Sequence, residues 1–251
     1  MNKAAQIIQD DDYSFPYHYI PQFRPGFTQA YVWSWGIYYI SALEFILERA
    51  RECAPTSILD VGTGDGRMAR ELTLAFPDTR VVGLDYSERA IQLARALNPG
   101  LEFLHHDITA QTLGEQFDLV TLVEVFEHIP PESAKDFAAA LPVLLKDNGI
   151  LLVTVPHRNI PVSVKHFQHF SAQSLIDYFK DQFDVEEVVF LDKRSRWVRL
   201  IKNLLHNRYF TLNHWGIRNR LYLFYKRFFL VTDEAHCGRV FVKLRKKSRP
   251  A

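Results

Sequence analysis

The order of hydrophobic and polar positions predicts strands and helices that alternate along most of the chain. Short apolar runs, typical of strands buried on both faces, are followed by segments in which apolar residues recur every three or four positions, as in an amphipathic helix. The apolar runs predict strands at 57–61, 80–84, 101–104, 117–123, 150–155, 184–191 and 239–244. The helical patterns predict helices at 33–52, 66–76, 87–97, 132–145 and 171–181. Alternation of this kind requires parallel strands with right-handed crossovers, so we expect an α/β, doubly wound, Rossmann-like sheet.

The first predicted strand runs into a glycine turn, S-I-L-D-V-G-T-G-D-G, from Ser57 to Gly66. A strand, a glycine turn and a helix bring a nucleotide close to the backbone. Arg67 stands where the dinucleotide fingerprint needs a glycine, and no phosphate-binding G-K-S/T follows. Asp60 and Asp65 flank the turn and would repel a pyrophosphate at the helix N-terminus. The ligand should therefore lack phosphates, a description that fits S-adenosylmethionine, a sulfonium with an ammonium group.

The second predicted strand ends at Asp85, nineteen residues beyond Gly66, where a carboxylate can accept both ribose hydroxyls. I-L-D-V-G-T-G-D-G followed by G-L-D-Y-S resembles the class I S-adenosylmethionine-dependent methyltransferases. The resemblance continues through H-H-D-I, F-D-L-V-T-L-V-E-V and G-I-L-L-V-T-V-P. It implies a seven-stranded sheet whose last strand runs antiparallel between strands five and six, and it places Asp107 at the adenine amino group. The cofactor-binding residues that we expect are Asp60, Gly62, Gly64, Asp85, Tyr86, Asp107, Ile108 and Glu124.

A single methyltransferase domain should therefore span all 251 residues. We divide it into an N-terminal lid segment and helix (1–53), a cofactor-binding core (54–191), a basic helical insertion (192–237), and the last strand with a basic tail (238–251). The resemblance suggests that the aromatic N-terminal segment closes over the cofactor, with Tyr17–Tyr19 facing the site. An aromatic brace packed on the domain surface is the alternative.

Composition favours an ordered cytoplasmic protein. Hydrophobic residues make up 47% of the chain and charged residues 24%, which argues against disorder. No apolar run reaches the length of a membrane span, and the polar start M-N-K-A-A-Q-I-I-Q-D-D-D does not read as a signal peptide. Cys53 and Cys237 are the only cysteines, which argues against a disulfide framework.

Acidic residues and histidines gather after the fourth and fifth predicted strands. V-E-V-F-E-H-I-P-P carries an acid pair and a histidine that one helical turn would put on adjoining faces. P-H-R-N-I-P-V-S-V-K-H-F-Q-H-F-S brings further histidines to the same sheet edge, His157, His166 and His169. Two carboxylates with two imidazoles suit a hard or borderline divalent cation, Mg²⁺ or similar. The candidate metal ligands are Glu124, Glu127, His128 and His166.

The E-x-x-E-H pattern resembles the metal motif of small-RNA 3′-terminal 2′-O-methyltransferases, and a similar arrangement occurs in ubiquinone-pathway O-methyltransferases. The resemblance implies a cation that binds adjacent hydroxyls and lowers their pKa. The pattern is also common in class I methyltransferases without a demonstrated metal. In that alternative, Glu127 and His128 hydrogen-bond the loop, and an imidazole acts as general base. The candidate catalytic residues are Glu124, His128 and His169.

Charge is divided unevenly along the chain, with a net +13 on residues 192–251 and −12 on residues 1–191. The insertion predicts two basic amphipathic helices. The apolar faces of these helices hold Trp197, Leu200, Ile201, Leu204 and Leu205 in the first and Ile217, Leu221, Phe224 and Phe228 in the second. In one interpretation of this pattern, the two helices pack on the domain and their arginines face solvent. In another interpretation, residues 193–230 bind an anionic membrane surface. We prefer a membrane to RNA as the partner because the apolar faces of the helices are aliphatic as well as aromatic.

The sequence thus predicts a methyltransferase that acts on a hydroxyl of a sugar, a lipid-linked glycan or another small acceptor, with or without the assistance of a metal. We expect it in the cytoplasm or peripherally at the inner membrane face. V-P-H-R-N-I-P-V-S-V-K-H-F-Q-H-F resembles bacterial methyltransferases of surface-glycan pathways. A lipid-linked diphosphate glycan would explain the basic insertion. The alternatives are a metal-dependent RNA 2′-O-methyltransferase and a non-catalytic scaffold or regulatory protein that binds the cofactor.

Overall fold

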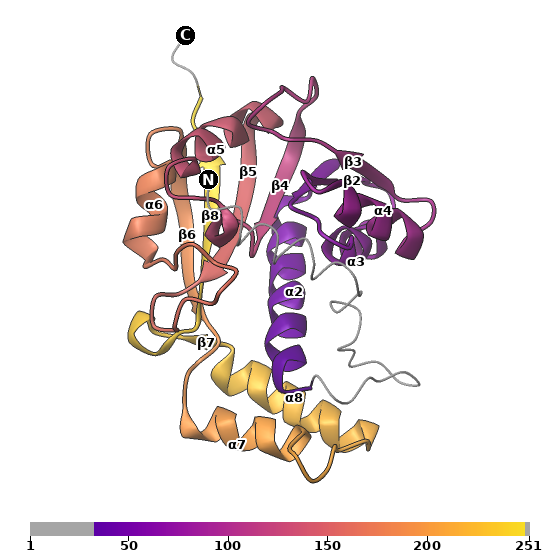
Figure 1. The fold of residues 1–251 in the computed structure, drawn as a ribbon, viewed down its shortest axis with the longest axis vertical. Coiled ribbons are helices and arrows are strands. Elements are labelled where there is room, and N and C mark those ends of the chain that lie inside the picture. The colour runs from indigo at the N-terminus through magenta and orange to yellow at the C-terminus, as the bar shows by residue number, and fades with distance from the viewer. Residues whose placement is uncertain (1–32, 249–251) are drawn as a thin grey trace.

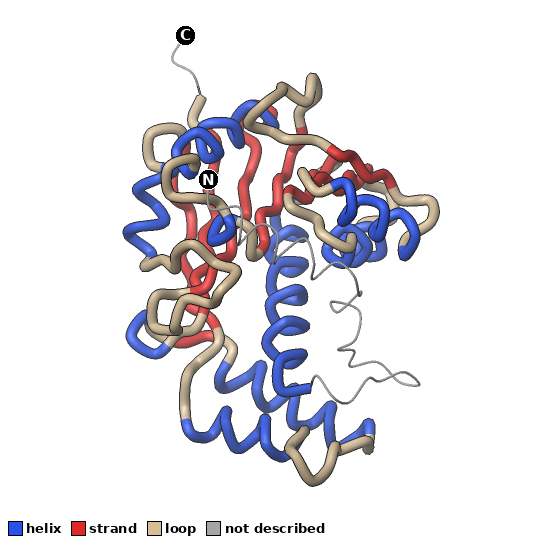
Figure 2. The backbone as a smooth tube through the Cα atoms, viewed as in Figure 1, coloured by secondary structure: helices blue, strands red, loops and turns tan. Residues whose placement is uncertain are grey.

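The computed structural model describes residues 33–248, whose strands form one eight-stranded sheet with helices on both faces (Figures 1 and 2). The strands are β1 (Ser57–Val61), β2 (Arg80–Asp85), β3 (Glu102–His105), β4 (Phe117–Val123), β5 (Leu145–Pro156), β6 (Phe183–Leu191), β7 (Val231–Thr232) and β8 (Arg239–Lys246). The α-helices are α2 (Trp33–Cys53), α3 (Arg67–Ala75), α4 (Glu88–Leu97), α5 (Ala134–Ala140), α6 (Ala172–Phe179), α7 (Arg196–Leu205) and α8 (Trp215–Phe229). Three 3₁₀ turns accompany them, η2 (Phe126–His128), η3 (Leu141–Leu144) and η4 (Glu234–His236). The predicted lid residues Tyr17–Tyr19 lie outside the described residues.

The strand order is β3-β2-β1-β4-β5-β8-β6-β7. β1 to β5 pair in parallel, and β8 runs antiparallel between β5 and β6, as predicted for the last strand. The eighth strand, β7, was not predicted. It holds two residues and pairs with the end of β6, and a segment this short has no periodicity to detect.

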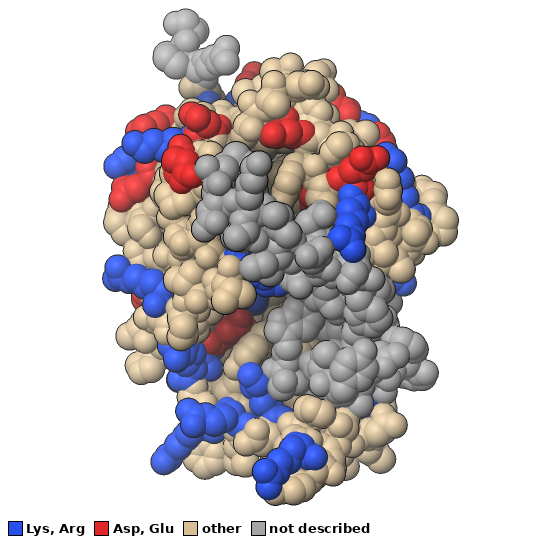
Figure 3. Space-filling view, in the orientation of Figure 1, with Lys and Arg blue, Asp and Glu red and all other residues tan. Residues whose placement is uncertain are grey.

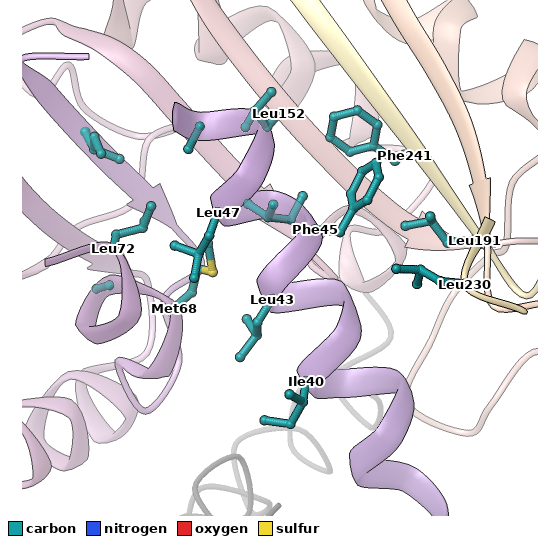
Figure 4. Packing of buried hydrophobic residues seen from close by; sticks show 14 of the residues in the cluster. Ile40, Leu43, Phe45, Leu47, Met68, Leu72, Leu152, Leu191, Leu230 and Phe241 are labelled. Carbon is teal, nitrogen blue, oxygen red and sulfur yellow. The ribbon is translucent and has the colours of Figure 1, made fainter. Parts of the chain in front are cut away.

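Two hydrophobic cores cover the two faces of the sheet, because alternate residues of each central strand point to opposite sides. Figure 4 shows part of the first core, where α2 packs Leu43 and Phe45 against neighbours that include Met68 of α3 and Phe241 of β8. The second core is covered by α5 and α6. The helical stripe predicted at 33–52 is confirmed by α2.

The predicted helix at 132–145 is shorter than expected. α5 ends at Ala140 and continues as the 3₁₀ turn η3, which contains Pro142. Proline has no N–H to donate and its ring clashes with the preceding turn, so the α-helix stops there. β5 consequently begins at Leu145, five residues earlier than predicted, and its pairing with β4 contains a register shift.

The two helices predicted in the insertion are present as α7 and α8, but most of the apolar positions assigned to them are exposed. α7 buries Ile201 and Leu205, whereas Trp197, Leu200 and Leu204 face solvent. α8 buries its tyrosines, Tyr222 and Tyr225, and exposes Ile217, Phe224 and Phe228. The tyrosine rings pack inward because their hydroxyls find carboxylate partners, at 2.7 Å from Glu44 and 2.7 Å from Asp192. No helix among the described residues is long and apolar enough to span a bilayer.

Candidate active site

A cavity of about 460 Å³ lies at the carboxyl edge of the parallel strands, the edge where open α/β sheets bind ligands. Its walls come from the loops after β1, β2, β3 and β4, from α2 and from the segment after β5. The structure brings every predicted cofactor residue to this cavity, namely Asp60, Gly62, Gly64, Asp85, Tyr86, Asp107, Ile108 and Glu124.

The glycine turn is held against the end of β2 by its own backbone. Gly62 and Thr63 donate their N–H groups to the carbonyl of Leu84 at 2.8 and 2.9 Å. Gly62 has a positive φ of 72°, and a Cβ there would lie 2.4 Å from a methyl carbon of Val125. Only glycine fits this position, because any side chain would clash and strain the backbone. The turn therefore exposes backbone, not side chains, to the cavity.

Two buried carboxyl groups face this turn. Asp85 accepts the N–H of Gly64 and of Ser87, both at 2.9 Å, which fixes the carboxylate at the tip of β2. Asp60 accepts the Thr121 hydroxyl at 2.7 Å. Burial raises the pKa of Asp60 to about 6, against the effect of the Thr121 hydrogen bond. Its second oxygen, Oδ2, has no hydrogen-bond partner among the described residues, so this end of the cavity suits a cationic group.

Glu124 does not share a helical turn with Glu127 and His128, contrary to the sequence prediction. Its φ is +57°, and the 3₁₀ turn η2 begins only at Phe126. The left-handed backbone sends the Glu124 carboxylate away from the turn, toward Arg239, whose Nε donates to it at 3.0 Å.

Arg239 extends this contact into a buried network. Its Nη1 lies 2.8 Å from Asp192, which also accepts the hydroxyl of Tyr225 at 2.7 Å. Burial opposes the charge of the guanidinium, but the carboxylates of Asp192 and Glu124 raise the pKa of Arg239 overall. Because Tyr225 belongs to α8, the network ties the insertion to the wall of the cavity.

Glu127, His128 and His166 form a second cluster on the cavity wall. One ligand atom from each residue lies within 4.8 Å of the others. Glu127 is 1% exposed, and burial and the neighbouring Glu124 hold the pKa of its carboxyl well above the usual range. Its Oε2 has no hydrogen-bond partner among the described residues. A buried carboxyl oxygen without a hydrogen-bond partner indicates a place for a water, an ion or a reacting group.

Backbone carbonyls orient His128 directly and His166 through His169. His128 Nδ1 lies 2.9 Å from the carbonyl of Lys165, which can only accept, so the proton is on Nδ1 and the lone pair on Nε2. His169 Nδ1 donates in the same way to Ile160, at 3.0 Å, and its Nε2 then accepts from His166 Nδ1 at 2.7 Å. The lone pair of His166 is therefore on Nε2. Hydrogen bonds of this kind typically orient metal-binding histidines.

The imidazole of His166 is neutral at ordinary pH. Burial, together with the positive charges near it, lowers the pKa of this group to about 3. Neutral imidazole is the form that binds metals.

The other predicted histidines lie elsewhere. His169 is absent from the described lining of the cavity and contacts His166 from behind. His157 is buried at the end of β5, with Nε2 3.3 Å from Glu234. Among the cavity residues that were not predicted are two with basic side chains, Lys165 and Arg239. The place of Arg239 at the cavity could have been predicted, because an antiparallel last strand necessarily starts at the carboxyl edge of its parallel neighbours.

Comparisons with known proteins identify a methyltransferase domain in this chain. The family described as "Methyltransferase domain" matches residues 58–149. The mitochondrial ubiquinone biosynthesis O-methyltransferase of Schizosaccharomyces pombe is 28% identical over 187 residues, covering 62% of this chain and 67% of the relative. The ubiquinone biosynthesis O-methyltransferase of Roseobacter denitrificans is 39% identical over 107 residues, 41% of this chain and 42% of the relative. The matched region thus spans between 42% and 67% of the length of these relatives.

Solved structures share the fold along nearly the whole chain. The N-methyltransferase NodS of Bradyrhizobium japonicum, bound to S-adenosyl-L-homocysteine, superposes with a TM-score of 0.63 at 13% identity, covering 98% of this chain and 100% of NodS. The DhpI complex with the same ligand gives 0.60 at 16% identity, covering 99% of this chain and 100% of DhpI.

Proposed function

Because the chain belongs to the class I S-adenosylmethionine-dependent methyltransferases, we propose that it transfers the cofactor's methyl group to a hydroxyl oxygen of a small acceptor, assisted by a divalent cation. The observation that carries the proposal is the Glu127, His128 and His166 cluster, which lines the same cavity as the glycine turn. Oxygen as the methylated atom is supported by the O-methyltransferases among the relatives.

The acids at the glycine turn fit a sulfonium cofactor. In this proposal Asp85 accepts the ribose hydroxyls, and Asp60 binds the ammonium group through the oxygen that lacks a partner. Tyr86, Asp107 and Ile108 border the space for the adenine ring. The cavity wall offers no phosphate-binding loop of the G-K-S/T type, in keeping with a ligand that has no phosphates.

The cation would be held by Glu127, His128 and His166. Glu124, also predicted as a ligand, instead shares its charge with Arg239. Two imidazole nitrogens and one carboxylate oxygen suit Zn²⁺, Mn²⁺ or Fe²⁺ better than Mg²⁺, which prefers oxygen ligands. Such a cation supplies Lewis acidity that lowers the pKa of a bound hydroxyl.

The protein residues have their own tasks in this reaction. Glu127 and the two imidazoles fix the position of the acceptor oxygen, and His169 keeps His166 in the tautomer that presents Nε2. In the alternative without a metal, His128 is the general base, because it lines the cavity.

We propose a sugar or a lipid-linked glycan as the acceptor, in the cytoplasm or at the inner membrane face. The support is chemical, since vicinal hydroxyls suit a metal-assisted transfer and the diphosphate of a lipid carrier would suit the basic insertion, which follows β6 at the cavity edge. An RNA 2′-hydroxyl is the second acceptor class.

Metal binding tests the cluster without an acceptor. The chelator-treated protein should bind one Zn²⁺ or Mn²⁺ per chain in calorimetry, and Glu127→Gln or His166→Ala should lose this site. His105→Ala removes an exposed histidine away from the cluster and should change nothing. No stoichiometric site in the wild-type chain, or equal loss in His105→Ala, would remove the cation from the proposal.

Methyl transfer is tested separately, by release of S-adenosylhomocysteine with sugars, vicinal diols and RNA as acceptors. We expect a chelator-sensitive O-methyl product from a diol or a sugar. Tight cofactor binding with no transfer to any acceptor would favour the non-catalytic scaffold.

A further inference from the structure

We propose that the outward face of α7 and α8 docks on an anionic lipid bilayer. The proposal goes beyond the reaction and is independent of it, because its residues lie outside the cavity and its test needs no acceptor.

Apolar side chains are exposed in a row on each helix. On α7, Trp197, Leu200 and Leu204 are between 44% and 55% exposed, and their spacing of three and four residues puts them on one face. The corresponding row on α8 is Ile217, Phe224 and Phe228, between 46% and 51% exposed. Exposed apolar side chains that gather on one part of a surface indicate an interaction site.

Each row lies next to the side of its helix that packs on the domain. α7 buries Val198, Ile201 and Leu205 in the core that contains α2, and α8 buries Tyr222 and Tyr225 in the same core. Figure 1 shows the two helices together across one end of the molecule, beyond the start of α2. On each helix the exposed row precedes the buried row by one residue, roughly 100° round the helix axis, so it flanks the packed side and stays accessible to solvent at that end.

The charge on this surface selects a lipid partner. Residues 193–232 contain ten Lys and Arg and no Asp or Glu. Arginines alternate with the exposed apolar rows, namely Arg196 and Arg199 on α7 and Arg220 and Arg227 on α8. Figure 3 shows blue side chains over this end and red ones gathered toward the opposite end.

Aromatic and basic side chains are also paired in space. The guanidinium of Arg196 lies 5.4 Å from the ring of Trp197, and that of Arg227 lies 5.3 Å from the ring of Phe228. This combination suits the interface of a bilayer, where an apolar ring enters the acyl boundary and an arginine meets the phosphate. RNA would leave the aliphatic side chains Leu200, Leu204 and Ile217 without a suitable contact.

The docked orientation would turn the cavity toward the membrane. α7 follows the carboxyl end of β6, and Arg239, which starts β8, lines the cavity. The insertion and the cavity therefore lie at the same edge of the sheet, and an acceptor carried by a lipid would reach the cavity from the bilayer.

Vesicle sedimentation of the full chain tests the proposal. Vesicles of phosphatidylcholine mixed with phosphatidylglycerol should retain the protein at low salt, and vesicles of phosphatidylcholine alone should not. Arg196→Gln and Arg199→Gln should each weaken binding roughly fivefold, since each cation near an anionic surface contributes about this factor. The triple change Trp197→Ser, Phe224→Ser and Phe228→Ser should abolish retention.

Matched control variants distinguish binding by this surface from nonspecific binding to vesicles. Leu74→Ser removes an equally exposed apolar side chain on α3, and Lys135→Gln removes an exposed cation on α5. Both should bind vesicles like the wild type, and circular dichroism should show every variant folded. No retention at low salt, equal losses in controls and surface variants, binding of RNA but not of vesicles, or a dimer broken by the triple change would each overturn the proposal.

Discussion

Asp60 and Arg239 carry the most consequential charges around the cavity, and their surroundings determine what a substitution would do. Asp60 is buried with one oxygen that has no partner among the described residues. Arg239 is largely shielded from solvent, with its side chain 12% exposed, and lies between two carboxylates. Asp60 can therefore bind a cationic ligand, whereas the positive charge of Arg239 is already neutralised by two carboxylates of the fold.

Cofactor affinity should depend on the ionisation of Asp60. Its pKa is raised to about 6, so the carboxylate is charged above that pH and neutral below it. The affinity for S-adenosylhomocysteine should therefore fall as the pH decreases from about 7 to about 5, because the ammonium group loses its anionic partner. Calorimetry across this range measures the effect.

Asp60→Asn should bind more weakly, roughly tenfold or more at neutral pH, and should lose the pH dependence. Asp78→Asn, at an exposed acid, serves as the control. An unchanged pH profile in Asp60→Asn would remove Asp60 from the site.

Arg239→Met should be strongly destabilising. It leaves Glu124 and Asp192 near each other without their shared cation, and breaking a buried ion pair from one side costs about 3–5 kcal/mol. Urea unfolding measures the free energy. Adding Asp192→Asn should recover part of the loss, and Arg245→Met on the more exposed end of β8 should cost little. A stable Arg239→Met variant would show that the network has no structural role.

At the scale of elements, hydrophobic periodicity predicted nearly every strand and helix of the core. β4 was predicted to the residue, and the cap of α4 followed from Ser87, whose hydroxyl accepts the N–H of Ala90. The contact between Glu124 and Arg239 could not be predicted, because the two residues are more than a hundred positions apart in the sequence. Spacing alone therefore overestimated the size of the acid cluster.

Which side of each insertion helix is buried could not be predicted from the sequence either. Periodicity identified the apolar rows on α7 and α8 but assigned no direction to them. On α8 the buried side is set by tyrosine hydroxyls that meet Glu44 and Asp192, and these acids belong to distant parts of the chain. The helical pattern identifies the residues that share one face of a helix, whereas contacts with neighbouring elements determine whether that face is buried or exposed.

Tyr225→Phe should loosen α8 from the domain. The change removes one hydroxyl that donates to a buried carboxylate, and such a bond contributes about 1.5–3 kcal/mol. Hydrogen exchange should show faster opening of α8, with β1 and β4 unaffected. Tyr209→Phe, at an exposed tyrosine, is the control. Equal exchange in both variants would contradict a docking role for Tyr225.

For the whole molecule, the charge split of −12 against +13 is reproduced in space only in part, because β8 carries Lys243, Arg245 and Lys246 away from the insertion. The acidic majority includes the carboxyl groups that line the cavity, and the basic insertion forms one end of the molecule (Figure 3). A cationic cofactor and an anionic partner can thus be attracted to different parts of one surface without competing.

In the proposed reaction, a cation site and the cofactor's methyl group share one cavity. The most direct measurement is the NMR linewidth of the S-methyl protons of S-adenosylmethionine bound to the protein in the presence of paramagnetic Mn²⁺. We predict strong broadening in the wild-type chain, none in Glu127→Gln, and wild-type broadening in His105→Ala. An unbroadened methyl signal from bound cofactor in the wild-type chain would contradict the account.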